Sequence, residues 1–355
     1  MRIARNAFRA TSGGKVWHNA RFLPSAIRTL AQRQNMLLQR YLLIWLVISS
    51  WIAFQWPSTW WDPFLRTAPY LKYMITVTMF AIGMMLPRDE VNLVIRRWYS
   101  VLGGTAIQYL AMPALGYLVG RAFGFEGPYL IGMVMVGCVP GAMASNVLTI
   151  NAGGNASYSV SLTTMATLVS PLAVPLALAL TLGAKSPEQK AILMDSAVFT
   201  LWSVVVPVVV GHVLARWTPD AERHYRHIGP LIANLVILWI IAVVVALNRT
   251  QLSSTPASMM VALLCVNAGG YAAGFTGGLG LRLPDGMRRA LTLEVGMQNA
   301  GLGATLASHL FPDQPETAIA PAMYTFGCML TGTILSRLWS LRGVQECEKS
   351  SSSSE

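Results

Sequence analysis

The chain has 355 residues, of which 54% are hydrophobic and only 12% are charged. A soluble domain carries about 25% charged residues, so this composition excludes an ordinary soluble protein and indicates a membrane protein with many spans. The net charge of +11 would suit a nucleic-acid-binding protein. The basic residues, however, lie in the loops between apolar segments, so we expect no nucleic-acid partner.

The chain begins with a basic arm over residues 1–35, which contains seven Lys and Arg residues and no acid. It holds no apolar core long enough for a secretory signal, so we expect a cytoplasmic arm. An organellar transit segment is the alternative, because such segments are also rich in Arg and poor in acids.

Ten apolar segments follow, and together they predict one transmembrane domain over residues 36–341 in contact with the lipid bilayer. They fall at about 37–56, 68–86, 98–120, 127–150, 156–182, 193–215, 228–247, 256–281, 287–310 and 317–340. The last stretch, residues 342–355, is polar and rich in serine, so we expect a disordered cytoplasmic tail.

The distribution of basic residues predicts the orientation of these segments. If the N-terminus is cytoplasmic, 20 of the 26 Lys and Arg residues lie on the cytoplasmic side and six lie outside. The positive-inside rule therefore places both termini in the cytoplasm. We expect an integral protein of a bacterial inner (plasma) membrane, or of an organelle envelope if the basic arm is a transit segment.

Ten spans divide into two sets of five, about 37–182 and about 193–340, and a five-span unit that is repeated must be inserted the second time in the opposite direction. Interruptions occur at corresponding places, at Pro140-Gly141 in the fourth span and around Asn299 in the ninth. Each lies about 16 to 18 Å deep, close to the bilayer midplane. We predict an all-α polytopic membrane protein with two inverted five-helix repeats, in which broken helices 4 and 9 cross at the midplane.

Glu294 lies in the middle of the ninth apolar segment, one helical turn before Gln298. A carboxylate at that depth costs roughly 2.5 to 3.5 kcal/mol on insertion, so its presence indicates a functional site. No Lys or Arg sits at the same depth, and a bound cation is therefore the expected partner. The structural alternative is that Glu294 pairs with a buried Arg or caps a turn.

Oxygen-bearing groups lie near both interruptions. Sodium is a hard cation, which prefers carboxylate, amide, hydroxyl and freed backbone carbonyl oxygens. Hydroxyls also bond to their own helix or join neighbouring helices, so the prediction depends on the whole set. The candidate sodium ligands are Ser145, Asn146, Ser159, Thr163, Glu294, Gln108, Val295, Met297 and Gln298.

A substrate is expected beside the ions, where helix ends present amide N–H groups to an anion. The absence of Lys and Arg at this depth leaves sodium and the helix ends to offset a negative charge. We therefore expect a small organic anion as the substrate. The candidate substrate contacts are Asn299, Gly141, Ala142, Met143 and Ala144.

The stretches Pro140–Asn146 and Glu294–Asn299 resemble the bile acid:sodium symporter family, whose members have Pro-Gly-x-x-Ala-Ser-Asn and Glu-x-Gly-x-Gln-Asn there. The resemblance spans nearly all of residues 68–340. It implies ten helices in a panel and a core domain, and sodium-coupled import of a small organic anion that is bile acid-like, pantothenate-precursor-like or keto-acid-like. It also implies two sodium sites, one with Ser145, Asn146, Ser159, Thr163 and Glu294, the other with Gln108, Glu294, Val295, Met297 and Gln298.

The chain departs from the family pattern at Val139, where members often have Cys, and at Met143, where they often have Thr. The lost hydroxyl changes the expected substrate pocket. We expect no enzyme activity, because no catalytic or nucleotide-binding constellation is visible, and no cofactor apart from sodium as the coupling ion. The alternative function is a proton-coupled antiporter or passive channel in which Glu294 titrates.

Overall fold

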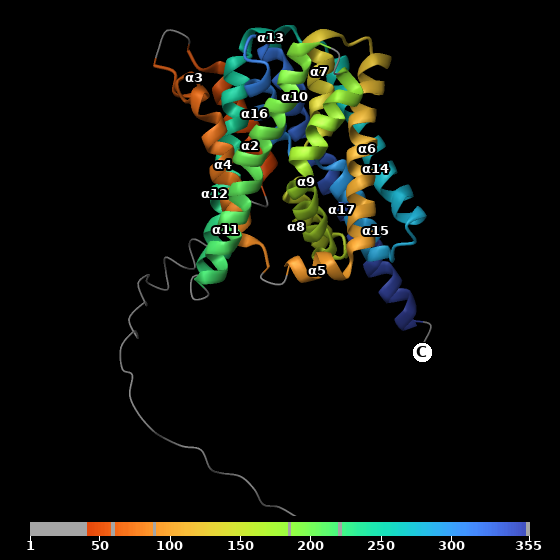
Figure 1. The fold of residues 1–355 in the computed structure, drawn as a ribbon. Coiled ribbons are helices and arrows are strands. Elements are labelled where there is room, and N and C mark those ends of the chain that lie inside the picture. Colours follow the sequence, from red (N-terminus) through yellow and green to blue (C-terminus); the bar gives the residue numbers. More distant parts are fainter. Residues whose placement is uncertain (1–40, 58–60, 88–89, 184–185, 219–221, 353–355) are drawn as a thin grey trace, which may run out of the picture.

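The computed structural model describes residues 41–57, 61–87, 90–183, 186–218 and 222–352. The basic arm predicted for residues 1–35 lies outside them. Within the described residues all regular elements are helical, and the β-pairing is a single isolated bridge (Figure 1). This agrees with a membrane environment, in which a helix satisfies its own backbone hydrogen bonds.

The helices follow the predicted apolar segments in order. Among the described residues, six stretches are long and apolar enough to cross a membrane, namely α6, α9, α10 to α11, α12 from Ile228, α14, and η4 to α17 as far as Leu341. The elements are α2 (Leu42–Gln55), α3 (Pro63–Thr67), η1 (Ala68–Tyr70), α4 (Leu71–Met85), α5 (Glu90–Arg96), α6 (Trp98–Ala122), α7 (Gly127–Cys138), α8 (Ala144–Asn151), α9 (Ala156–Leu182), α10 (Pro187–Thr200), η2 (Leu201–Val205), α11 (Val206–Trp217), α12 (Glu222–Leu247), α13 (Arg249–Ser254), α14 (Ser258–Gly280), α15 (Asp285–Gly296), α16 (Ala300–Leu310), η4 (Pro315–Ala318) and α17 (Ile319–Ser352).

The last helix differs from the sequence-based expectation. The backbone of α17 is helical as far as Ser352, whereas a disordered tail was predicted from residue 342. Adding a residue to an existing helix requires no new nucleus, so the good helix formers Gln345, Glu346 and Glu348 continue a helix that the membrane segment has already started.

The helices pack in two groups. The first consists of α2, α4, α11 and α12, on the left of Figure 1, and the second contains α6 to α9 with α14, α15 and α17. The halves of the two interrupted segments differ in their neighbours. α8 and α15 pack within the second group, whereas α16 also packs against α4, α10 and α12.

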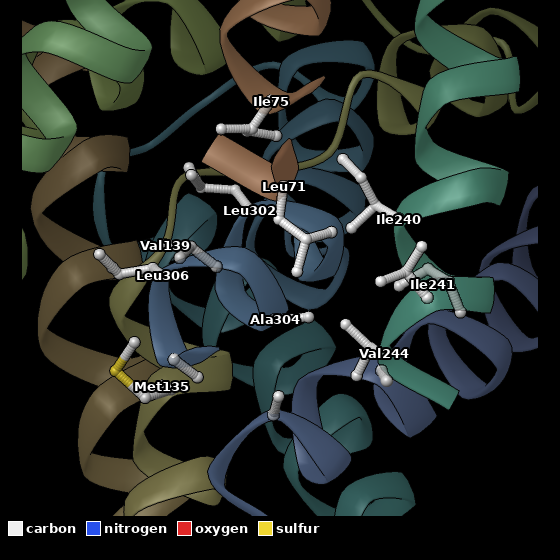
Figure 2. Close-up of a cluster of buried hydrophobic side chains, with 14 of the residues drawn as sticks. Leu71, Ile75, Met135, Val139, Ile240, Ile241, Val244, Leu302, Ala304 and Leu306 are labelled. Atoms are coloured by element: carbon white, nitrogen blue, oxygen red, sulfur yellow. The ribbon is translucent and has the colours of Figure 1, made fainter. Parts of the chain in front are cut away.

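A cluster of buried apolar side chains joins the two groups at the level of α16 (Figure 2). Leu71 and Ile75 of α4 and Ile240 of α12 lie with Val139 and Leu302, and at most 5% of each side chain is exposed. Where lipid is the alternative environment, its tails are as apolar as these side chains, so close packing stabilises this contact between the helices.

Asp62 joins three elements at the end of the molecule that is predicted to lie outside. Its Oδ1 caps α3 by accepting the backbone N–H groups of Phe64 at 2.8 Å and Leu65 at 3.1 Å. Its Oδ2 lies 2.7 Å from Arg249 Nη2, and Arg249 Nε donates to the Ala53 carbonyl at 2.8 Å. The pair therefore ties α2 and α3 to the start of α13.

We expect Asp62→Asn to lower the free energy of unfolding by about 1 to 3 kcal/mol at pH 7, because the cap oxygen stays but the charge is lost. Burial alone raises the pKa of the Asp62 carboxyl, but the Leu65 N–H and the Arg249 guanidinium outweigh it, so this pKa lies below its ordinary value. A lowered folded-state pKa gives stability that is complete above the ordinary pKa of about 4 and is lost as the pH falls through the folded-state value. Thermal unfolding should therefore show wild type and variant converging at acid pH. A difference that is independent of pH would contradict this role.

Candidate functional site

The two interrupted segments lie against each other through their unwound backbone. The Ala142 N–H donates to the Met297 carbonyl and the Asn299 N–H donates to the Pro140 carbonyl, each at 2.8 Å. This is the antiparallel bridge between Gly141 and Gln298. Each break therefore satisfies the backbone groups that the other leaves free, as buried backbone requires.

Glu294 lies at this crossing and is fully buried. Its carboxylate accepts hydrogen bonds from Ser145 Oγ of α8 at 2.5 Å and from Thr163 Oγ1 of α9 at 2.6 Å. Gly141 faces the carboxylate so closely that a Cβ there would collide with it. None of the ion pairs of the described residues includes Glu294, so the alternative of a buried Arg partner finds no support.

Two further predicted sodium ligands, Ser159 and Asn146, make no hydrogen bond to Glu294 among the described residues. Ser159 Oγ lies 3.3 Å from Thr149 Oγ1, and the Ser159 carbonyl oxygen lies 3.1 Å from Thr163 Oγ1, whose proton bonds to Glu294. Asn146 follows Ser145 in α8, and its buried Oδ1 lacks a hydrogen-bond partner among the described residues. A buried acceptor without a donor is suited to a cation.

A second group of amide and carbonyl oxygens lies on the α6 side of the crossing. Gln108 Nε2 lies 3.3 Å from Gln298 Oε1 and 3.5 Å from the Val139 carbonyl. Gln298 Nε2 donates to the Val295 carbonyl at 2.7 Å. The structure therefore brings Gln108 and Gln298 together, two of the five residues that the family resemblance implies for the second ion.

The predicted substrate contacts have different surroundings in the structure. Gly141 and Ala142 belong to the crossing itself, and the Ala142 N–H is already bonded there. Asn299 caps α16, because its Oδ1 accepts the Leu302 N–H at 3.1 Å. Met143 packs against the apolar cluster of Figure 2, and Ala144 begins α8.

Sequence reasoning missed two polar residues near the crossing. Asn267 of α14 and Tyr324 of α17 both donate to the Gly296 carbonyl, each at 2.7 Å. Asn267 is a lone amide in an apolar segment, the same signal that singled out Gln108, and it could have been found in that way.

The model of the Sodium Bile acid symporter family matches residues 72–255, more than half of the chain. The chain belongs to this family. It is 31% identical to the uncharacterized sodium-dependent transporter YocS of Bacillus subtilis, over 84% of this chain and 90% of that protein. It is 27% identical to the probable chloroplastic sodium/metabolite cotransporter BASS1 of Oryza sativa, over 86% of this chain and 75% of that one.

The fold is similar to that of the sodium proton antiporter MjNhaP1 from Methanocaldococcus jannaschii. The TM-score is 0.57 with 12% sequence identity, and the match covers 89% of this chain and 97% of the antiporter. The membership of the family means that the protein is a membrane transporter and not an enzyme.

Proposed function

We propose that this protein is a sodium-coupled symporter that brings a small organic anion into the cytoplasm by alternating access. The observation that carries the proposal is Glu294, a fully buried carboxylate held by two hydroxyls where two broken helices meet. A buried anion without a positive partner is strongly disfavoured. A bound sodium ion removes that cost, so the site favours occupation by the ion.

We assign the first sodium ion to the hydroxyl side of Glu294 and the second to the amide side. The short contacts of Ser145 and Thr163 with the carboxylate support the first site. The contact between Gln108 and Gln298 supports the second. Because Glu294 belongs to both proposed ligand sets, its single negative charge would offset one of the two ion charges, and the anionic substrate would offset the other. The proposed ligands are Ser145, Asn146, Ser159, Thr163 and Glu294 for the first ion, and Gln108, Glu294, Val295, Met297 and Gln298 for the second.

The proposed architecture is ten spans in two inverted repeats, with the crossing near the bilayer midplane. The group of α2, α4, α11 and α12 would be the panel, and the second group the core that carries the ions. α16 packs against α4 and α12, whereas α8 and α15 pack within the core. This difference supports an arrangement that is closed on the outside and faces the cytoplasm.

The substrate would lie beside the sodium ions, at the N-terminal ends of α8 and α16. Asn299 and the backbone of residues 141–144 lie at that point, where the helix ends favour a negative charge. The Ala142 and Asn299 N–H groups are bonded within the crossing, so the Asn299 side-chain amide and the N–H groups of residues 141, 143 and 144 would face the anion. An organic anion is the substrate class that this chemistry supports. The curated relatives named above are a sodium-dependent transporter and a sodium/metabolite cotransporter. We propose a plasma membrane location, with an organelle envelope as the alternative.

A proton-linked antiporter or channel is the second candidate function. It is favoured by the fact that the crossing has one carboxylate, Glu294, whose two hydroxyl partners can bond to either protonation state. Both candidates use the same residue, and they differ in the ion that it holds and in how the movement of that ion is coupled to the substrate.

Uptake into proteoliposomes distinguishes the two functions. The purified chain would be reconstituted and given labelled organic anions, with taurocholate, pantoate and pyruvate as the first panel. An inward sodium gradient should drive uptake of at least one of them, whereas an equal potassium gradient should not. Uptake that follows a pH gradient and ignores sodium would overturn sodium coupling in favour of the proton-linked function.

A further inference from the structure

Four side chains from α14 and α17 surround the backbone of Gly296, the last residue of α15. Asn267 Nδ2 and Tyr324 OH both donate to its carbonyl oxygen. Thr331 Oγ1 donates to Asn267 Oδ1 at 2.6 Å, which fixes the orientation of the amide. The ring of Tyr271 lies where a Cβ at position 296 would be. We call these four residues the Gly296 cradle.

Glycines of α14 bring the cradle within reach of α15. A Cβ at Gly270 would lie 3.1 Å from the Gly296 Cα, and a Cβ at Gly274 would lie 2.7 Å from the Leu291 carbonyl oxygen. The distance at Gly274 is too short for any side chain and the distance at Gly270 is tighter than an ordinary contact, so the two helix backbones lie in close contact. The short side chain of Asn267 can then reach the end of α15.

The cradle determines where the neighbouring carbonyls point. A carbonyl oxygen has two lone pairs, and the Gly296 oxygen uses both for Asn267 and Tyr324. The carbonyls on either side are bonded elsewhere, that of Val295 to Gln298 Nε2 and that of Met297 to the Ala142 N–H. Holding Gly296 on the α14 side therefore keeps the Val295 and Met297 oxygens at the crossing.

The first broken helix has a weaker version of the same arrangement. Gln108 of α6 lies 3.5 Å from the carbonyl of Val139, which follows the last residue of α7. At the end of α15 the Asn267 amide lies closer, 2.7 Å from the Gly296 carbonyl oxygen, and the Tyr324 hydroxyl donates to the same oxygen. The stronger anchor thus lies on the helix that carries Glu294.

We propose that Asn267 and Tyr324 are positioning residues for sodium binding, which act through the Gly296 carbonyl without touching the ion. They hold the unwound segment so that the carbonyl oxygens of Val295 and Met297 point toward the second sodium ion. Without the two donors, the segment must adopt this geometry at the moment of binding, and the ion binds more weakly. The inference rests on the proposed sodium coupling.

The test is a sodium titration of the thermal unfolding temperature of the full chain in detergent, with ionic strength held constant by potassium. For Tyr324→Phe we expect the sodium concentration at half-maximal stabilisation to rise about fivefold, the equivalent of one hydrogen bond. For Asn267→Ala we expect a rise of about tenfold or more, because the lost amide also frees Thr331. If Asn267→Ala does not fold, Tyr324→Phe alone decides.

Tyr158→Phe is the matched control. Tyr158 is fully buried in α9, and its hydroxyl donates to the Ser100 carbonyl at 2.7 Å, away from the cradle. This variant should unfold at a lower temperature in potassium but keep the wild-type sodium midpoint. If Tyr324→Phe behaves in the same way, its role is merely structural and the inference is overturned while sodium coupling stands. If the wild type itself lacks a sodium-specific response, the proposed function falls and the inference with it.

Discussion

Glu294→Gln should abolish the stabilisation of the protein by sodium. Glutamine has nearly the same shape and can still bond to Ser145 and Thr163, but it lacks the charge that offsets a cation. A ligand that binds only the folded state stabilises it by about 2.7 kcal/mol at a concentration of 100 times its Kd. The wild type should therefore unfold several degrees higher in sodium than in potassium, and the variant should unfold at one temperature in both.

The same substitution should leave the variant at least as stable as wild type in potassium. Without an ion, the wild type keeps a buried carboxylate that costs roughly 2.5 to 3.5 kcal/mol at membrane depth, and the amide does not. Glu126→Gln is the control, because this exposed glutamate pairs with Arg121 at 3.0 Å and such surface pairs contribute little. An undiminished sodium response in Glu294→Gln would refute the ion site.

Gly141→Ala should remove both transport and sodium stabilisation. A Cβ at this position would lie 2.6 Å from the carboxyl carbon of Glu294 and still closer to Oε1. The added methyl group must either push the carboxylate away from Ser145 and Thr163 or separate Gly141 from Gln298. Such overpacking typically costs about 1 to 3 kcal/mol of stability. Uptake in proteoliposomes and thermal unfolding measure the two effects on one preparation.

Gly280→Ala is the matched control for this experiment. Gly280 is the last residue of α14, and a Cβ there would meet no described atom within 4 Å. Its stability should stay the same or rise slightly, since alanine favours the helix over glycine. Normal sodium stabilisation and uptake in Gly141→Ala would show that the crossing tolerates a side chain, contrary to its geometry.

The sequence predicted the two interruptions well, because Pro140-Gly141 and the glycines around Asn299 are strong local signals. It also predicted that Ser145 and Thr163 would lie opposite Glu294, since intramembrane polar groups face the protein interior. The partner of each hydroxyl was harder to foresee, because it depends on how helices rotate against one another.

Two features of the site could not be predicted from the sequence. The contact of Asn267 is with a backbone carbonyl of another helix, and a backbone group leaves no mark on the residue pattern. The different surroundings of the candidate substrate contacts could not be predicted from residue type either. Met143 turns toward the apolar cluster while Gly141 faces Glu294, and this follows from the shape of the break, not from residue type.

The apolar cluster of Figure 2 affects how readily the proposed inward-facing arrangement could change to an outward-facing one. An outward opening would let water reach side chains such as Leu302 and Ile240, at about 1.5 to 3 kcal/mol for each one fully wetted. If no other contact offset it, this free-energy cost would leave the outward-facing state too rarely populated for turnover. α8 carries Val147 and Ile150, which are 44% and 61% exposed. Under the proposed alternating access, burying such surface on the cytoplasmic side would offset that cost, so that the outward-facing state would gain one apolar contact as it loses another.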